Sequence, residues 1–134
     1  MPLRAPRRQR LLVDATTFLE RVADEMERSE RYGHPFTMLL IEVPSALEKG
    51  RRLRTLRAVA VAARSLVRGC DLVAVFERPE MFAVLLPETT VAGAARVLER
   101  FQTQIADGSG TWNVRLAIYP YDRCAIEMFL RKAA

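Results

Sequence analysis

Four short apolar runs are distributed along this chain among four longer segments whose apolar residues recur every three or four positions. The short runs are residues 36–43, 72–76, 82–86 and 112–119. Each is too short for a stable helix, so each is predicted to be a strand. The periodic segments predict amphipathic helices at residues 17–32, 46–67, 90–105 and 123–132.

The second and third runs are separated by the polar segment Glu77-Arg78-Pro79-Glu80, which predicts a hairpin. The predicted order of elements is α-β-α-β-β-α-β-α. Strands separated by helices, with one central hairpin, predict a single sheet of at least four strands with helices packed on it. The fold class is therefore an α/β (α+β) sandwich.

The boundaries of the domain follow from composition. The chain has 134 residues, which fits one domain. Residues 1–13 include Arg4, Arg7, Arg8 and Arg10 and predict a basic, flexible tail, so the domain is assigned to residues 14–134. Thr17-Phe18-Leu19-Glu20 has the form of a capping box, so the first helix is expected to begin near 14 or 17 and to end near Tyr32-Gly33.

Charge and cysteine content restrict the class of protein. The net charge is +5, and nearly all the cations are arginines, which favours anionic partners. Cys70 and Cys124 fit neither a zinc nor a redox spacing and are expected to be free thiols in a reducing cytoplasm. No apolar run approaches the roughly 20 residues that span a bilayer, so no membrane span is predicted.

Several segments in chain order carry a resemblance to a known family. They are Glu30-Arg31-Tyr32-Gly33-His34-Pro35-Phe36, Leu39-Leu40-Ile41-Glu42, Arg68-Gly69-Cys70-Asp71-Leu72-Val73-Ala74 and Phe82-Ala83-Val84-Leu85-Leu86-Pro87. Together, over about residues 14–130, they resemble a GGDEF (diguanylate cyclase) domain. The resemblance implies a nucleotidyl cyclase-like fold with a central mixed sheet, and a place in bacterial signalling.

The sequence departs from this family where its chemistry resides. The signature Gly-Gly-Asp/Glu-Glu-Phe falls on Arg78-Pro79-Glu80-Met81-Phe82, where only Glu80 and Phe82 match. Arg and Pro replace the two glycines that let the backbone approach the phosphates. The strand-end metal motif is reduced to Glu42, and the segment that holds the guanine base is absent. The resemblance therefore implies a catalytically inactive domain with no cofactor, unless Glu42 and Glu80 retain a vestigial magnesium site.

Arg68-x-x-Asp71 has the form of the family's product-binding site, which precedes the signature turn. An arginine can grip a phosphate, and an aspartate can accept hydrogen bonds from a guanine edge. These two residues are therefore candidates for binding cyclic di-GMP. The alternative interpretation is an arginine favoured by a helix C-terminus, followed by a turn aspartate.

The function predicted from sequence is an inactive regulatory or scaffolding domain that binds a protein partner, with cyclic di-GMP as a candidate ligand and a homodimer left open. A second hypothesis is a magnesium-dependent nucleotide-binding enzyme that uses Glu42 and Glu80. A third, less favoured, is a nucleic-acid-binding module that uses the arginine tail and Arg51, Arg52, Arg54 and Arg57. His34, the one histidine, is expected to be a loop residue without catalytic partners.

Overall fold

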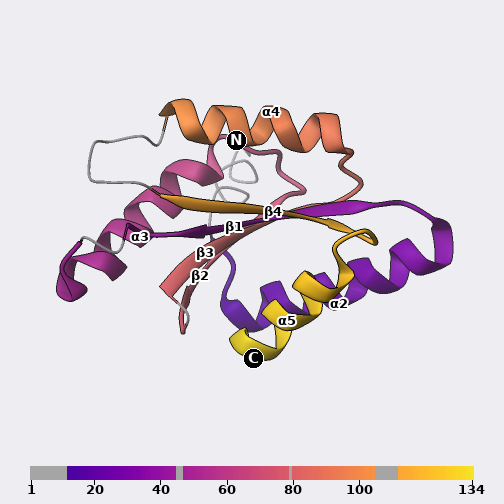
Figure 1. Ribbon diagram of the computed structural model, residues 1–134, viewed down its shortest axis with the longest axis horizontal. Coiled ribbons are helices and arrows are strands. Elements are labelled where there is room, and N and C mark those ends of the chain that lie inside the picture. Colours follow the sequence, from indigo (N-terminus) through magenta and orange to yellow (C-terminus); the bar gives the residue numbers. More distant parts are fainter. Residues whose placement is uncertain (1–11, 45–46, 79, 105–111) are drawn as a thin grey trace, which may run out of the picture.

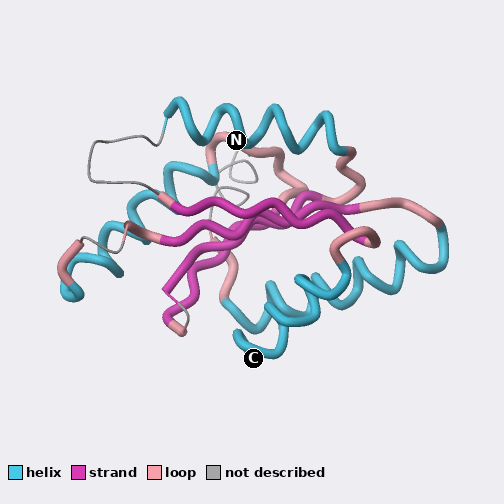
Figure 2. The backbone as a smooth tube through the Cα atoms, viewed as in Figure 1, coloured by secondary structure: helices cyan, strands magenta, loops and turns pink. Residues whose placement is uncertain are grey.

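The computed structural model describes residues 12–44, 47–78, 80–104 and 112–134. A four-stranded sheet lies between two layers of helices (Figures 1 and 2). The elements in chain order are α2 (Ala15–Tyr32), β1 (Phe36–Glu42), α3 (Lys49–Arg64), β2 (Leu72–Glu77), β3 (Glu80–Leu86), α4 (Val91–Gln104), β4 (Asn113–Tyr119) and α5 (Arg123–Ala133). The predicted order of helices and strands is confirmed, as is the predicted sandwich.

The sheet has the strand order β2-β3-β1-β4, and every neighbouring pair is antiparallel. The predicted β2–β3 hairpin is confirmed, but the expectation of a mixed sheet was wrong. A crossover helix joins two strands that run in the same direction. Here each such pair is split by a strand of the opposite direction: β3 lies between β1 and β2, and β1 lies between β3 and β4. This split arrangement makes the sheet antiparallel throughout.

Both faces of the sheet are covered, which explains why its strands are continuous apolar runs. Helices α2 and α5 pack on one face, and α3 and α4 pack on the other (Figure 1). Side chains alternate between the two cores along β1. Phe36, Met38 and Leu40 face α2 and α5, whereas Leu39 and Ile41 face α3 and α4.

The ends of α2 show how local sequence sets an element boundary. Asp14 is the N-cap, and its Oδ1 atom accepts a hydrogen bond from the Thr17 backbone N–H at 2.7 Å. This bond lowers the pKa of the Asp14 carboxyl. Of the two predicted starts, the one near Asp14 is confirmed, whereas the predicted capping box at Thr17 was wrong because the helix begins one turn earlier. Its predicted end is confirmed: Gly33 adopts φ 76°, a left-handed conformation that suits glycine.

None of the helices in the described part of the chain is long and apolar enough to cross a membrane.

Candidate ligand-binding pocket

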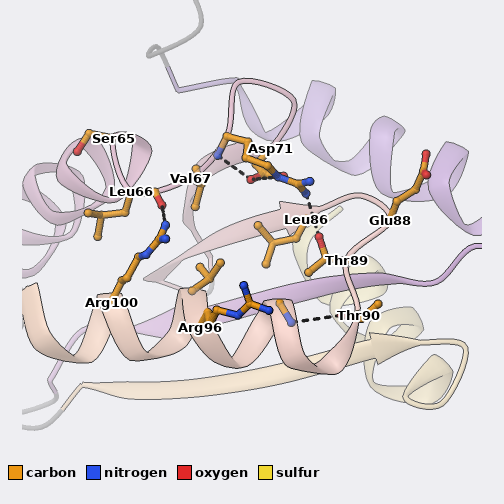
Figure 3. Close-up of a pocket in the computed structure, with 13 residues that line it drawn as sticks. Ser65, Leu66, Val67, Asp71, Leu86, Glu88, Thr89, Thr90, Arg96 and Arg100 are labelled. Carbon is orange, nitrogen blue, oxygen red and sulfur yellow. Dashed lines mark hydrogen bonds and ion pairs between the residues drawn. The ribbon is translucent and has the colours of Figure 1, made fainter.

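A pocket of about 510 Å³ lies at the end of the sheet where β3 finishes and β2 begins (Figure 3). Its walls are the turn after α3, the β3–α4 connection and one side of α4. Three elements end or begin at this place: α3 ends at Arg64, β3 is followed by Pro87, and α4 starts at Val91. The charged residues that line the pocket are Arg68, Asp71, Glu88, Arg96 and Arg100.

Arg68 and Asp71, the pair predicted from sequence, lie together in this pocket. The Asp71 side chain is only 2% exposed, whereas that of Arg68 is 57% exposed. Asp71 Oδ1 accepts from Arg68 Nη2 at 3.0 Å, and Oδ2 accepts from Arg68 Nε at 3.3 Å and from its backbone N–H at 2.8 Å. The hydrogen bond to Asp71 raises the pKa of the Arg68 guanidinium. The pair is thus a closed fork-to-carboxylate contact.

This geometry separates the roles of the two residues. The Asp71 side chain is buried and both its oxygens accept hydrogen bonds from Arg68, so the carboxylate orients Arg68. Arg68 Nη2 also donates to the Pro87 carbonyl at 3.1 Å and to Thr89 Oγ1 at 2.9 Å. No described residue accepts a hydrogen bond from Arg68 Nη1. That amino group is therefore the part of the Arg68 guanidinium that the described residues leave without an acceptor.

Arg96 and Arg100 were not singled out by the sequence analysis. They lie one turn apart on α4, and both are exposed. Arg100 Nη1 donates to the Leu66 carbonyl at 3.4 Å, and Figure 3 shows Arg96 reaching from α4 into the pocket. The signal available in the sequence was their four-residue spacing on the polar side of a predicted helix. With Arg68 they place three guanidinium groups around one pocket.

Glu88 lies at the rim and carries the remaining negative charge of the pocket. Its backbone has φ 48°, a left-handed conformation that is uncommon for a residue with a side chain. The carboxylate lies 3.5 Å from Arg28 Nη2 and 3.6 Å from His34 Nδ1. In Figure 3 it points away from α4. His34, expected to be a loop residue, is in the connection between α2 and β1.

The two carboxylates predicted as a vestigial metal pair are not brought together. Glu42 lies opposite Met81 in the β1–β3 ladder, so both side chains project toward α2 and α5. Glu80 precedes Met81 and projects to the other face, where its Oε1 atom is 3.3 Å from Arg52 Nη1 of α3. Glu42 accepts a hydrogen bond from Asn113 Nδ2 at 2.8 Å instead. No cluster of three metal-ligating side chains occurs within the described ranges.

The segment that matches the signature turn contributes mainly to packing. Met81 and Phe82 are buried, one in each core, and Pro79 lies outside the described residues. Arg78 is exposed beside the hairpin turn. Arg57 of α3 lies 3.6 Å from Glu77, so α3 contacts acids on both strands of the hairpin. Two of the four arginines proposed as a nucleic-acid stripe, Arg52 and Arg57, are therefore ion-paired within the domain.

Comparison with known proteins identifies the fold. No protein-family model and no curated protein matches the sequence. Solved structures do match. A diguanylate cyclase (DGC) protein from Thermotoga maritima is 19% identical, with a TM-score of 0.75 over 94% of this chain and 98% of that one.

Two further structures connect this fold to ligands and partners. The diguanylate cyclase SiaD from Pseudomonas aeruginosa, in complex with its activator SiaC, is 24% identical with a TM-score of 0.67, over 91% of this chain and 55% of that one. A microbial GGDEF domain with cyclic di-GMP is 12% identical with a TM-score of 0.65, over 91% of this chain and 82% of that one. The chain therefore has the fold of a GGDEF domain, as its sequence resemblance implied.

The closed Arg68–Asp71 pair leads to a stability prediction. Asp71→Asn keeps the side-chain volume but removes the charge that holds Arg68, so we expect it to lower the free energy of unfolding by about 2 kcal/mol. Glu88→Gln removes a carboxylate from the same pocket, but an exposed one, and should change stability by less than about 1 kcal/mol. Urea denaturation measures both. Equal losses in the two variants would contradict the role assigned to Asp71.

Proposed function

We propose that this domain is a non-enzymatic regulatory module that binds cyclic di-GMP in the arginine-lined pocket and passes the signal to a protein partner. The observation that carries the proposal is the convergence of Arg68, Arg96 and Arg100 on one pocket, with Arg68 held in place by a buried carboxylate. The GGDEF domain with cyclic di-GMP and the complex of SiaD with its activator support both parts of it.

The chemistry of the pocket suits a ligand with two phosphates. Arg68 belongs to the turn after α3, and Arg96 and Arg100 belong to α4, so the pocket has cations from two different walls. Arginine is the side chain best suited to phosphate recognition. The volume of about 510 Å³ falls within the usual range for a small-molecule site. Cyclic di-GMP carries two phosphates in one compact ring and fits this arrangement.

The role proposed for Asp71 differs from the one expected from sequence. Asp71 was expected to accept hydrogen bonds from a guanine edge, but its oxygens are buried and already bound to Arg68. We therefore assign the phosphate contacts to the three arginines and the orientation of Arg68 to Asp71.

The arrangement of the acids supports the absence of cyclase activity. Magnesium catalysis of phosphoryl transfer needs carboxylates that converge on one metal. Here Glu42 and Glu80 project to opposite faces of the sheet, and Arg52 neutralises Glu80. We therefore favour a cytoplasmic signalling role without a resident metal over the magnesium-dependent enzyme. The nucleic-acid-binding hypothesis gains no support from the paired Arg52 and Arg57.

Calorimetric titration with cyclic di-GMP tests the ligand. Binding should be detectable and should weaken as salt is added, because the contacts are charge-assisted. Arg68→Ala should weaken binding about tenfold or more, since a hydrogen bond between charged groups contributes about 1.5–3 kcal/mol. Arg96→Ala and Arg100→Ala should each weaken it as well.

The matched control is Arg131→Ala, which removes an exposed arginine from α5 on the other side of the sheet. This variant should bind like the wild-type protein. If Arg131→Ala weakened binding as much as Arg68→Ala, the attraction would be a property of net charge and not of the pocket. A wild-type protein that gave no heat with millimolar cyclic di-GMP would refute the ligand assignment.

Incubation with GTP and magnesium tests the absence of catalysis. We expect no cyclic di-GMP by chromatography, with an active diguanylate cyclase as the positive control. Product that formed in the wild-type protein and disappeared in Glu80→Gln would show that the hairpin retains an active site.

A further inference from the structure

Arg64, the last residue of α3, has a buried charged side chain that does not line the pocket. Only 4% of the residue is accessible to solvent. Its guanidinium turns into the connection that follows the helix. There Nη1 donates to the Asp71 carbonyl and Nη2 donates to the Arg68 carbonyl. The two bonds therefore end on the two residues that the pocket depends on.

With these two bonds, the turn from Arg68 to Asp71 is held by both backbone and side-chain hydrogen bonds. The Asp71 N–H donates to the Arg68 carbonyl at 3.0 Å, and the Asp71 carboxylate accepts from the Arg68 N–H at 2.8 Å. Arg64 then bridges the carbonyls at both ends of the same turn. The backbone positions of Arg68 and Asp71 are thus fixed relative to α3, and the direction of the Arg68 fork follows from them.

Burying a charged guanidinium at this position costs free energy, so packing alone does not explain why the residue is an arginine. Burial disfavours the charged guanidinium and lowers the pKa of Arg64, while the nearby Asp71 carboxylate opposes that effect. Arg64 Nε has no hydrogen-bond partner among the described residues. A methionine would fill a similar volume without burying a charge. What only the arginine supplies is a pair of donors at a fixed separation, aimed at two carbonyls.

We propose that Arg64 is the positioning residue of the ligand pocket, an inference that rests on the proposed function. In the pattern Arg64-x-x-x-Arg68-x-x-Asp71, the first arginine holds the turn and the aspartate holds the second arginine. The second arginine presents one amino group, Nη1, to a phosphate. Preorganisation of this kind strengthens binding because the ligand does not have to order the turn when it binds.

The experiment compares Arg64→Met with Leu56→Ala, and cyclic di-GMP is the ligand. Leu56 is a fully buried residue of the same helix that packs on the sheet. Leu56→Ala therefore destabilises the domain without touching the turn. At a temperature where both variants are folded, Arg64→Met should weaken binding about tenfold, the factor expected from the loss of about one charge-assisted contact. Leu56→Ala should bind like the wild-type protein.

Arg64→Lys provides a graded variant, since a single ammonium can reach one carbonyl but cannot hold both as a planar fork does. Its affinity should fall between those of the wild-type protein and Arg64→Met. Equal weakening in Arg64→Met and Leu56→Ala would show that Arg64 is only a stabilising residue and would overturn the proposal. Unchanged binding in Arg64→Met would overturn it as well.

A readout without ligand separates this proposal from the proposed function. In the wild-type protein and in Leu56→Ala, the Arg68 Nε–H proton should give a slowly exchanging NMR signal, because it is bonded to Asp71. In Arg64→Met that signal should broaden or disappear. If the wild-type protein bound no cyclic di-GMP but showed this pattern, the ligand assignment would fail and the role of Arg64 in the turn would stand. A signal unchanged by Arg64→Met would remove that role.

Discussion

The buried carboxylate of Asp71 is the group on which the pocket depends. It accepts hydrogen bonds from both the backbone and the side chain of Arg68, at the point where the chain passes from α3 into the edge strand β2. A buried carboxylate is stable only when its oxygens are satisfied, so the turn must close around it. That closure directs Arg68 toward the β3–α4 connection, where Thr89 and the Pro87 carbonyl bind it.

The two ends of the sheet differ in whether their charged side chains are paired within the domain. At the pocket end, three guanidinium groups surround an open space, and the Glu88 carboxylate is drawn toward Arg28 and His34. At the hairpin end, the acids are paired within the domain, Glu80 with Arg52 and Glu77 with Arg57. The charges at the first end are available to an anion, whereas those at the second end stabilise the packing of α3 on the hairpin.

The elements of the fold could be predicted because each depends on local pattern. Short apolar runs such as 82–86 and the helical repeat around Phe18 and Val22 suffice to predict type and order. The relative direction of neighbouring strands could not be predicted in the same way. It depends on which strand lies between the two strands that each crossover helix joins. The sequence left two starts open for α2, because Asp14 and Thr17 both have side chains that favour the N-cap position, and only the structure shows that Asp14 is the N-cap.

The site was predictable only in part, because motifs specify residues and not burial. Arg68 and Asp71 were singled out because Arg68-x-x-Asp71 resembles the product-binding motif of GGDEF domains, but the occupation of both Asp71 oxygens depends on how tightly the turn folds. Arg64 was not singled out, because its burial depends on where α3 ends and how the following turn folds. Arg96 and Arg100 were found only once α4 was placed against the turn. A vestigial magnesium site required Glu42 and Glu80 to lie close together, but the register of β1 on β3 sends their side chains to opposite faces of the sheet.

We propose that this domain binds its ligand in the pocket at one end of the sheet and has no working nucleotide site at the other. Amide and arginine side-chain NMR shifts of isotope-labelled protein during titration with cyclic di-GMP test it most directly. We expect the shift changes to concentrate at Arg68, Thr89, Arg96 and Arg100, while the signals of Glu42, Glu77 and Glu80 stay unchanged. Changes centred on the β2–β3 hairpin, or the absence of any change, would contradict it.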